Sequence, residues 1–147
     1  MISNKCYYAL KAMLELAKRE GGGPVTIGDI ADAQKMPARF LESILRQLKQ
    51  AGFTDSMRGK EGGYYLAKSA REISVGEILR LIEGPLVAVS PFASQDESSS
   101  GASHDPFVEV WGSAEEALTA VLDDIRFDDL ASKEIERERR HVADYMI

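Results

Sequence analysis

Residues 38–67 have the sequence ARFLESILRQLKQAGFTDSMRGKEGGYYLA, and the period of their hydrophobic pattern changes halfway along. In the first half the apolar residues recur at the spacing of an amphipathic helix. In the second half the period shortens to about two, which predicts a strand over 53–58, a flexible turn over 59–63 and a return strand over 64–67. We therefore expect a helix followed by a β-hairpin with a basic, glycine-rich tip.

Two further helices are expected before this unit. Residues 4–20 place apolar side chains at helical spacing, with charged residues such as Glu15 between them, and the Gly21–Pro24 segment ends the pattern. Thr26 is a good N-cap for a short second helix, because Asp29 follows it where negative charge stabilises the first turn. The order helix, short helix, helix, hairpin indicates a winged helix-turn-helix domain over residues 1–73.

The second half of the chain begins with a capping box, Ser74-Val75-Gly76-Glu77, which predicts a helix ending at Gly84-Pro85. Residues 90–105 form a polar loop that is too rich in small polar groups to pack. Pro106 then begins a long helix with an apolar stripe that reaches Ile125. The fold class is mainly α with a small β-hairpin: a winged helix-turn-helix domain plus a long dimerisation helix.

The stripe of the long helix is larger than the apolar surface available to cover it within one chain. An ordinary core helix is the alternative, but Ile78, Leu79 and Ile82 offer only part of a partner surface. A second copy of the same helix solves this problem and defines 74–147 as a dimerisation and regulatory region. The candidate dimerisation residues are Phe107, Val110, Trp111, Ala114, Leu118, Val121, Leu122 and Ile125.

The net charge of −6 conceals an uneven distribution. Residues 1–73 hold 12 Lys and Arg against 8 Asp and Glu, a net +4, whereas residues 74–147 hold 6 against 16, a net −10. This asymmetry suggests a polyanion-binding module with an appendage, although an unevenly charged solvated surface explains the charge equally well. The longest uncharged apolar run, 85–92, is too short to cross a bilayer, and the first residues lack a secretory pattern. A cytoplasmic protein is expected.

The predicted recognition helix and hairpin supply the chemistry for binding duplex DNA. In a helix-turn-helix the N-terminal residues of one helix meet base edges in the major groove. There Arg39 can donate to guanine, Glu42 can accept from the cytosine amino group, and Ser43 can do either. The hairpin residues Arg58 and Lys60 can reach phosphates or the minor groove. A surface helix with ordinary charges is the alternative. Further candidate phosphate contacts are Lys5, Arg46 and Lys49.

Catalysis and metal binding find little support. His104 lies in the polar loop and His141 in the charged tail, and no cysteine or histidine spacing fits zinc. We expect no enzyme activity, no metal and no cofactor. Cys6 is interpreted as a small buried hydrophobe. The alternative is a thiol redox sensor, with the pKa of Cys6 lowered by the neighbouring Lys5.

Several motifs together resemble the Rrf2 family of bacterial winged-helix regulators, and the similarity covers nearly the whole chain. They include Met57-Arg58-Gly59 with Gly62-Gly63-Tyr64, the 73–78 segment, and Ile82-Glu83-Gly84-Pro85. The resemblance implies a homodimer with crossing long helices. A two-fold dimer places two recognition helices one turn of DNA, or a multiple of it, apart, which matches a pseudo-palindromic operator. It also implies DNA contacts at Arg39, Phe40, Glu42 and Arg58. The full set of candidate DNA-binding residues is Lys5, Thr26, Ala38, Arg39, Phe40, Glu42, Ser43, Arg46, Arg58 and Lys60.

The chain departs from the cluster-binding members of the family in one respect. Those members carry three cysteines in the loop before the long helix, whereas this sequence has serines there, from Ser90 to Ser103, and no cysteine. Serine hydroxyls are poor iron ligands beside thiolates, so no iron–sulfur cluster is expected. The prediction is a dimeric, cluster-free transcriptional repressor. The alternatives are a protein-interaction adaptor that binds a metabolic enzyme of the cysteine-biosynthesis type, or the thiol sensor.

Overall fold

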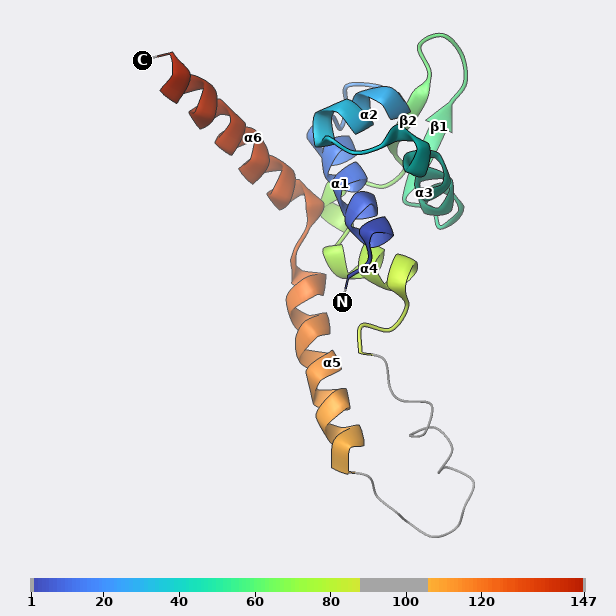
Figure 1. The fold of residues 1–147 in the computed structure, drawn as a ribbon, viewed down its shortest axis with the longest axis vertical. Helices are drawn as coiled ribbons and strands as arrows, with labels where there is room; N and C mark the ends of the chain where they lie inside the picture. Colours follow the sequence, from blue (N-terminus) through green and yellow to red (C-terminus); the bar gives the residue numbers. More distant parts are fainter. Residues whose placement is uncertain (1, 88–105, 147) are drawn as a thin grey trace.

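The structure, a computed structural model, describes residues 2–87 and 106–146 (Figure 1). The prediction of a mainly helical fold with a β-hairpin is confirmed. The predicted polar loop 90–105, which includes His104, lies outside the described residues. The elements are α1 (Asn4–Lys18), α2 (Ile27–Gln34), α3 (Ala38–Gln50), β1 (Thr54–Met57), β2 (Gly63–Leu66), the short 3-10 helix η1 (Ala70–Glu72), α4 (Val75–Glu83), α5 (Pro106–Asp124) and α6 (Phe127–Tyr145).

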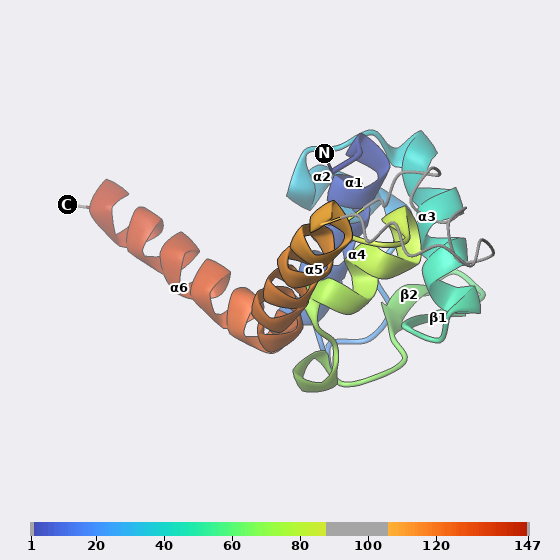
Figure 2. The same cartoon turned by 90° about the horizontal axis from the view of Figure 1, so that it is seen from below.

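Helix α1 lies at the centre of the hydrophobic core, with α2, α3, α4 and the start of α6 packed around it (Figure 2). Several of its buried side chains are small, Ala9 and Ala12 among them, so neighbouring helices approach closely. Ile78 of α4 and Phe127 of α6 belong to the same core. The core therefore continues past residue 73, and the division of the chain at that point stays a prediction.

The expectation that the charged residues of α1 lie at the surface is wrong for Glu15. It is only 2% exposed, although its charge suggested a solvated position on α1. Its Oε1 lies 3.7 Å from Nζ of Lys18 and 3.8 Å from Nε of Arg19. Lys18 also pairs with Glu138, which connects α1 to α6. Two cations three and four residues further along therefore pair with one carboxylate oxygen, whereas the other, Oε2, is buried without a hydrogen-bond partner among the described residues.

The predicted helix ends are confirmed. The hydroxyl of Thr26 accepts a hydrogen bond from the backbone N–H of Asp29 at 3.1 Å, so it caps α2. Ser74 and Glu77 form the reciprocal capping box at the start of α4, and Gly84 ends that helix with φ +83°. Each cap joins residues three positions apart, and Gly84 ends its helix through its own backbone angle. These helix ends are therefore determined by the local sequence.

The hairpin forms with the antiparallel register Thr54–Leu66 to Met57–Gly63. Backbone bonds between Val25 and Tyr64, both at 2.8 Å, attach the second strand to the segment before α2. A Cβ on Gly63 would collide with the carbonyl of Val25, so only glycine permits this close approach. The wing is thereby held against the body at the strand nearest α2.

Helix α5 extends away from the body, and α6 leaves its upper end in another direction (Figure 1). The hydrophobic pattern predicted no helix or strand over residues 126–147, where the structure forms α6. Phe127 and Ala131, one turn apart, are its buried residues, and most of its other side chains are exposed. The sequence did not predict this helix, because its apolar stripe is short and most of its other residues are charged. Among the described helices, none combines the length and apolarity needed to span a membrane.

Candidate nucleic-acid interface

Helix α3 divides into a buried face and an exposed face. Leu41, Ile44, Leu45 and Leu48 are buried as predicted. The residues proposed to face DNA point outward, because they occupy the remaining positions of the same helical period. The exposed candidate DNA-binding residues on α3 are Ala38, Arg39, Phe40, Glu42, Ser43 and Arg46.

Two of these exposed residues form an ion pair. Nη2 of Arg46 lies 3.0 Å from Oε1 of Glu42, one turn away, and both side chains are more than 60% exposed. Such a pair contributes about 0.5 kcal/mol or less, so a phosphate or a base can displace either member at low cost. The hydroxyl of Ser43 donates to the carbonyl of Phe40 at 3.2 Å.

The N-terminus of α3 is connected to α1 through an aromatic stack. The rings of Tyr8 and Phe40 lie nearly parallel with centroids 6.2 Å apart, and the guanidinium of Arg39 lies 4.7 Å from the centroid of Phe40. Lys5 lines a small hollow with Tyr8 and Phe40. The structure therefore brings Lys5 next to the predicted recognition residues. Tyr8, which the sequence places in the apolar stripe of the first helix, does pack against the core, and its stack on Phe40 is a contact that the sequence did not predict.

The hairpin carries the other predicted contacts. Arg58 and Lys60 are exposed in the turn that joins β1 to β2. Lys49 at the end of α3 donates to Oγ of Ser56 at 2.7 Å and lies 3.7 Å from Oδ1 of Asp55. Lys49 therefore connects α3 to β1, the first strand of the wing. The prediction of a phosphate contact did not include this structural role.

Thr26 is exposed at the N-terminus of α2, one residue from the Val25–Tyr64 bridge. A helix N-terminus offers backbone N–H groups to anions. Asp29 in the first turn opposes an anion there, so Thr26 is the weakest of the predicted DNA contacts on electrostatic grounds.

Cys6 is fully buried in α1, as expected for a small hydrophobe. Burial, together with the nearby carboxylate of Glu83, raises the pKa of the Cys6 thiol to about 11. The expectation that Lys5 lowers this pKa is therefore wrong. Hydrogen bonds from the hydroxyl and backbone N–H of Ser3 lower the pKa of Glu83, which keeps that carboxylate charged. A thiol that stays protonated does not suit a redox sensor.

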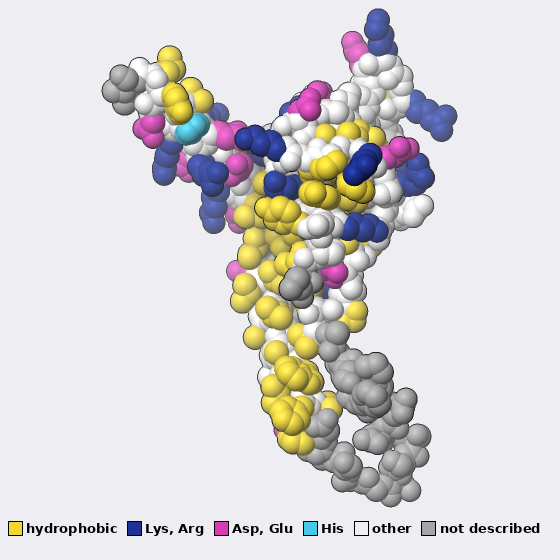
Figure 3. All heavy atoms as spheres, viewed as in Figure 1, with side chains coloured by type: hydrophobic (Ala, Val, Ile, Leu, Met, Phe, Trp, Pro, Cys, Tyr) yellow, Lys and Arg dark blue, Asp and Glu magenta, His cyan; other side chains and the backbone are white. Residues whose placement is uncertain are grey.

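Helix α5 has no buried residue in the single chain. Trp111 is 43% exposed and Val121 is 61% exposed, and Figure 3 shows hydrophobic side chains along this helix. The candidate dimerisation residues divide by exposure. Phe107, Val110, Trp111, Leu118 and Val121 are exposed, while Ala114, Leu122 and Ile125 are partly covered.

An outward-facing helix beside a hairpin that displays Arg58 and Lys60 in its turn defines a winged helix-turn-helix regulator that binds DNA. The family model described as "Rrf2: Iron-dependent Transcriptional regulator" matches residues 2–133. The chain belongs to the Rrf2 family of transcriptional regulators, as the resemblance in its sequence predicted.

Named relatives agree with this assignment. The chain is 34% identical over 131 residues to the transcriptional regulator CymR of Bacillus subtilis, which covers 89% of each chain. It is 31% identical over 143 residues to IscR of Pectobacterium atrosepticum, which covers 97% of this chain and 84% of that one. Both relatives are named regulators and not enzymes, in agreement with the prediction.

A solved structure also matches. The structure of CymR, named the global cysteine regulator of B. subtilis, superposes with a TM-score of 0.75 at 34% identity and covers 90% of this chain and 97% of that one. The winged-helix fold predicted from the sequence is therefore confirmed at the level of the backbone.

Proposed function

We propose that the protein is a homodimeric, cluster-free repressor that binds a pseudo-palindromic operator in duplex DNA, in the cytoplasm. The observation that carries this proposal is the uncovered apolar face of α5. A 19-residue helix without a buried residue, displaying Trp111, Leu118 and Val121, exposes a surface that soluble proteins usually cover with a partner. A second copy supplies an identical face, which is the usual isologous solution.

In this proposal the two halves of the chain have different roles. Residues 1–73 present the DNA contacts and residues 74–147 hold the two copies together. A two-fold axis places two α3 helices one helical turn of DNA, or a multiple of it, apart. Binding there excludes other proteins from the same DNA, which is the physical basis of repression. The proposed contacts are the ten residues predicted from the sequence, with α3 and the wing as the centre.

The donor set does not fit an iron–sulfur cluster. Such clusters are held by several cysteine thiolates. This chain has one cysteine, and its thiol is buried and holds its proton. In residues 2–87 and 106–146 no group of three His, Cys, Asp or Glu side chains is arranged to hold a metal. We therefore assign regulation in this protein to a signal other than a cluster.

The test is DNA binding by the purified protein as a function of salt. Genome-wide footprinting on its own chromosome identifies operator sites, and a duplex from one such site is then titrated at several salt concentrations. We expect log affinity to fall with log salt with a slope of about −5 or steeper, because two copies contact several phosphates each. Salt-independent binding, or a monomer on the operator, contradicts the proposal. Retained affinity in a strong iron chelator is expected, and a loss of affinity there contradicts the cluster-free assignment.

A second candidate function rests on the end of α6. Val142, Tyr145 and Met146 are 58%, 82% and 83% exposed where α6 projects from the body (Figure 1). This end suits an adaptor that binds a metabolic enzyme of the cysteine-biosynthesis type. Capture of one dominant enzyme without promoter DNA favours the adaptor, whereas recovery of promoter DNA favours the repressor.

A further inference from the structure

A cavity of about 580 Å³ lies between α1, α2 and α6, and none of the proposed DNA-binding residues lines it. This volume falls in the range of about 300–1,000 Å³ that is common for small-molecule sites. Sequence reasoning could not find it, because α6 forms one wall and was not predicted.

The inner wall of the cavity is apolar. Leu10 and Leu14 of α1 line it together with Phe127 and Leu130 of α6. Phe127 is 1% exposed and belongs to the core, so this wall is held in place by packing and is formed before a ligand arrives.

The remaining wall is cationic. Lys11, Lys35 and Arg137 line the cavity with a single acid, Glu134. Figure 3 shows Lys and Arg side chains beside hydrophobic surface where α6 meets the body. Nζ of Lys11 donates to the carbonyl of Gln34 at 3.2 Å and lies 5.2 Å from the centroid of the Tyr7 ring. An ammonium has three donors, so Lys11 is fixed by one bond and can still donate to an anion.

We infer that this cavity binds a small organic anion, with an apolar or aromatic body against the leucines and a carboxylate, sulfonate or phosphate against Lys11 and Arg137. Charge-assisted hydrogen bonds to two cations orient such a ligand. Lys35 lies in the turn between α2 and α3, whereas Arg137 lies on the helix that follows α5. The ligand therefore joins the helix-turn-helix to the segment that continues from the proposed dimerisation helix, which is the position required of an effector.

The test uses two dyes that share their rings and differ in charge: anilinonaphthalene sulfonate, and phenylnaphthylamine, which lacks the sulfonate. Affinities are measured by fluorescence on the full chain without DNA, so failure of the proposed DNA function does not affect the result. The test variant is Lys11→Gln with Arg137→Gln. The matched control, Lys133→Gln with Arg139→Gln, removes the same charge from exposed positions on α6 outside the cavity.

We expect the affinity of the test variant for the sulfonate dye to fall about tenfold, the equivalent of about 1.4 kcal/mol, with no change for the neutral dye. The control variant, and a Lys11→Arg with Arg137→Lys variant that keeps both charges, retain the affinity of the natural protein. Equal affinity of the test and control variants for the sulfonate dye overturns the proposal. An equal decrease for both dyes also overturns it, because the cations then select no anion.

Discussion

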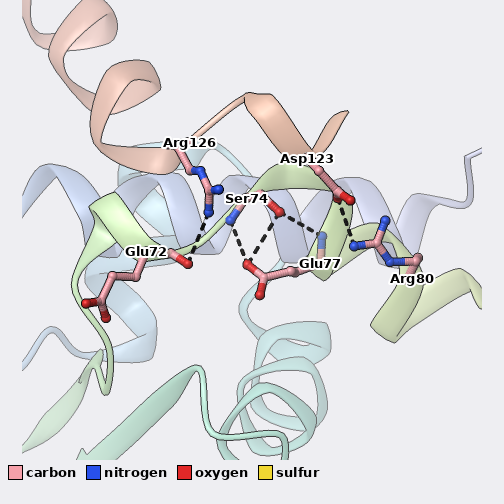
Figure 4. Close-up of polar contacts among 6 residues, drawn as sticks. All are labelled: Glu72, Ser74, Glu77, Arg80, Asp123 and Arg126. Carbon is pink, nitrogen blue, oxygen red and sulfur yellow. Dashed lines mark hydrogen bonds and ion pairs between the residues drawn. The ribbon is translucent and has the colours of Figure 1, made fainter. Parts of the chain in front are cut away.

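The backbone of Ser74 pairs with that of Arg126 in an isolated antiparallel bridge, although the two residues are far apart in the sequence. The N–H of Val75 donates to the carbonyl of Ile125 at 2.9 Å, and the N–H of Phe127 donates to the carbonyl of Ile73 at 3.1 Å. The bridge holds the junction of α5 and α6 against the start of α4 (Figure 4). The segment that joins the hairpin to α4 is therefore connected to the end of the proposed dimerisation helix by backbone hydrogen bonds.

Side chains reinforce the bridge. Nη2 of Arg80 on α4 lies 2.8 Å from Oδ1 of Asp123 on α5, and Arg126 donates to the carbonyl of Glu72 at 3.4 Å. A Cβ on Gly76 would collide with the Asp123 carboxylate, so any larger residue there would have to displace the Asp123 side chain that pairs with Arg80. Several contacts at this junction thus fix the end of α5 against the body.

We predict that Ser74→Ala lowers the free energy of unfolding by about 1–2 kcal/mol. Ser74 is 2% exposed and its hydroxyl caps α4, so removing this hydroxyl leaves the N–H of Glu77 without its cap. Chemical denaturation measures the change. Ser69→Ala is the matched control, because Ser69 precedes η1 without a side-chain cap bond and should not alter stability. Equal stability of both variants would show that the capping box contributes nothing.

Arg58→Ala should weaken operator binding by about tenfold and leave the melting temperature unchanged. Arg58 is exposed in the wing turn, and removing its interaction with a phosphate reduces the salt slope by about 1 per protomer. Arg71→Ala, an exposed arginine outside the wing, controls for the change in net charge. An unchanged affinity for Arg58→Ala removes the wing from the mechanism.

Val121→Glu should convert the proposed dimer into a monomer in sedimentation velocity. Val121 is 61% exposed on α5, and a carboxylate pressed against its counterpart in a two-fold apolar contact is strongly unfavourable. Val142→Glu makes the same change at a valine that is 58% exposed on α6, and it should leave the mass unchanged. If Val121→Glu still sediments as the natural protein does, α5 is not the dimer contact.

Cys6 should resist alkylation in the folded protein. With a pKa of about 11, fewer than about one thiol in a thousand is ionised near neutral pH, and only the thiolate reacts quickly. Iodoacetamide labelling followed by mass spectrometry should show slow reaction in buffer and ordinary reaction in guanidinium. Fast labelling of the folded chain would restore the thiol-sensor hypothesis.

The same thiol predicts a pH dependence of stability. Its folded pKa of about 11 is higher than the ordinary value of 9.0, so the unfolded chain releases this proton first as pH rises. The contribution to stability is complete below about pH 9 and is lost as pH rises toward 11. Across this pH window, the melting temperature should fall less steeply with rising pH for Cys6→Ala than for the natural protein. Parallel declines would show that Cys6 does not titrate differently on folding.

Local chemistry made much of the fold predictable. The caps Thr26 and Ser74 act on residues three positions away, and the buried face of α3 follows from its own period. The predicted DNA-binding side chains of α3 are exposed for the same reason, because they lie on the face of this amphipathic helix opposite its buried leucines. Those of the wing are exposed because they lie in the turn between its two strands. These features depend on neighbours along the chain, and the sequence contains those neighbours.

By itself, then, the sequence determined which segments form the helix-turn-helix and the wing, and which family they belong to. Only the tertiary structure placed Tyr8 against Phe40, buried Glu15, folded α6 back onto α1 through Phe127, and formed the open cavity between them. Each of these depends on segments that are distant in sequence approaching one another. Periodicity along one segment shows which face is apolar, but not which remote element covers it.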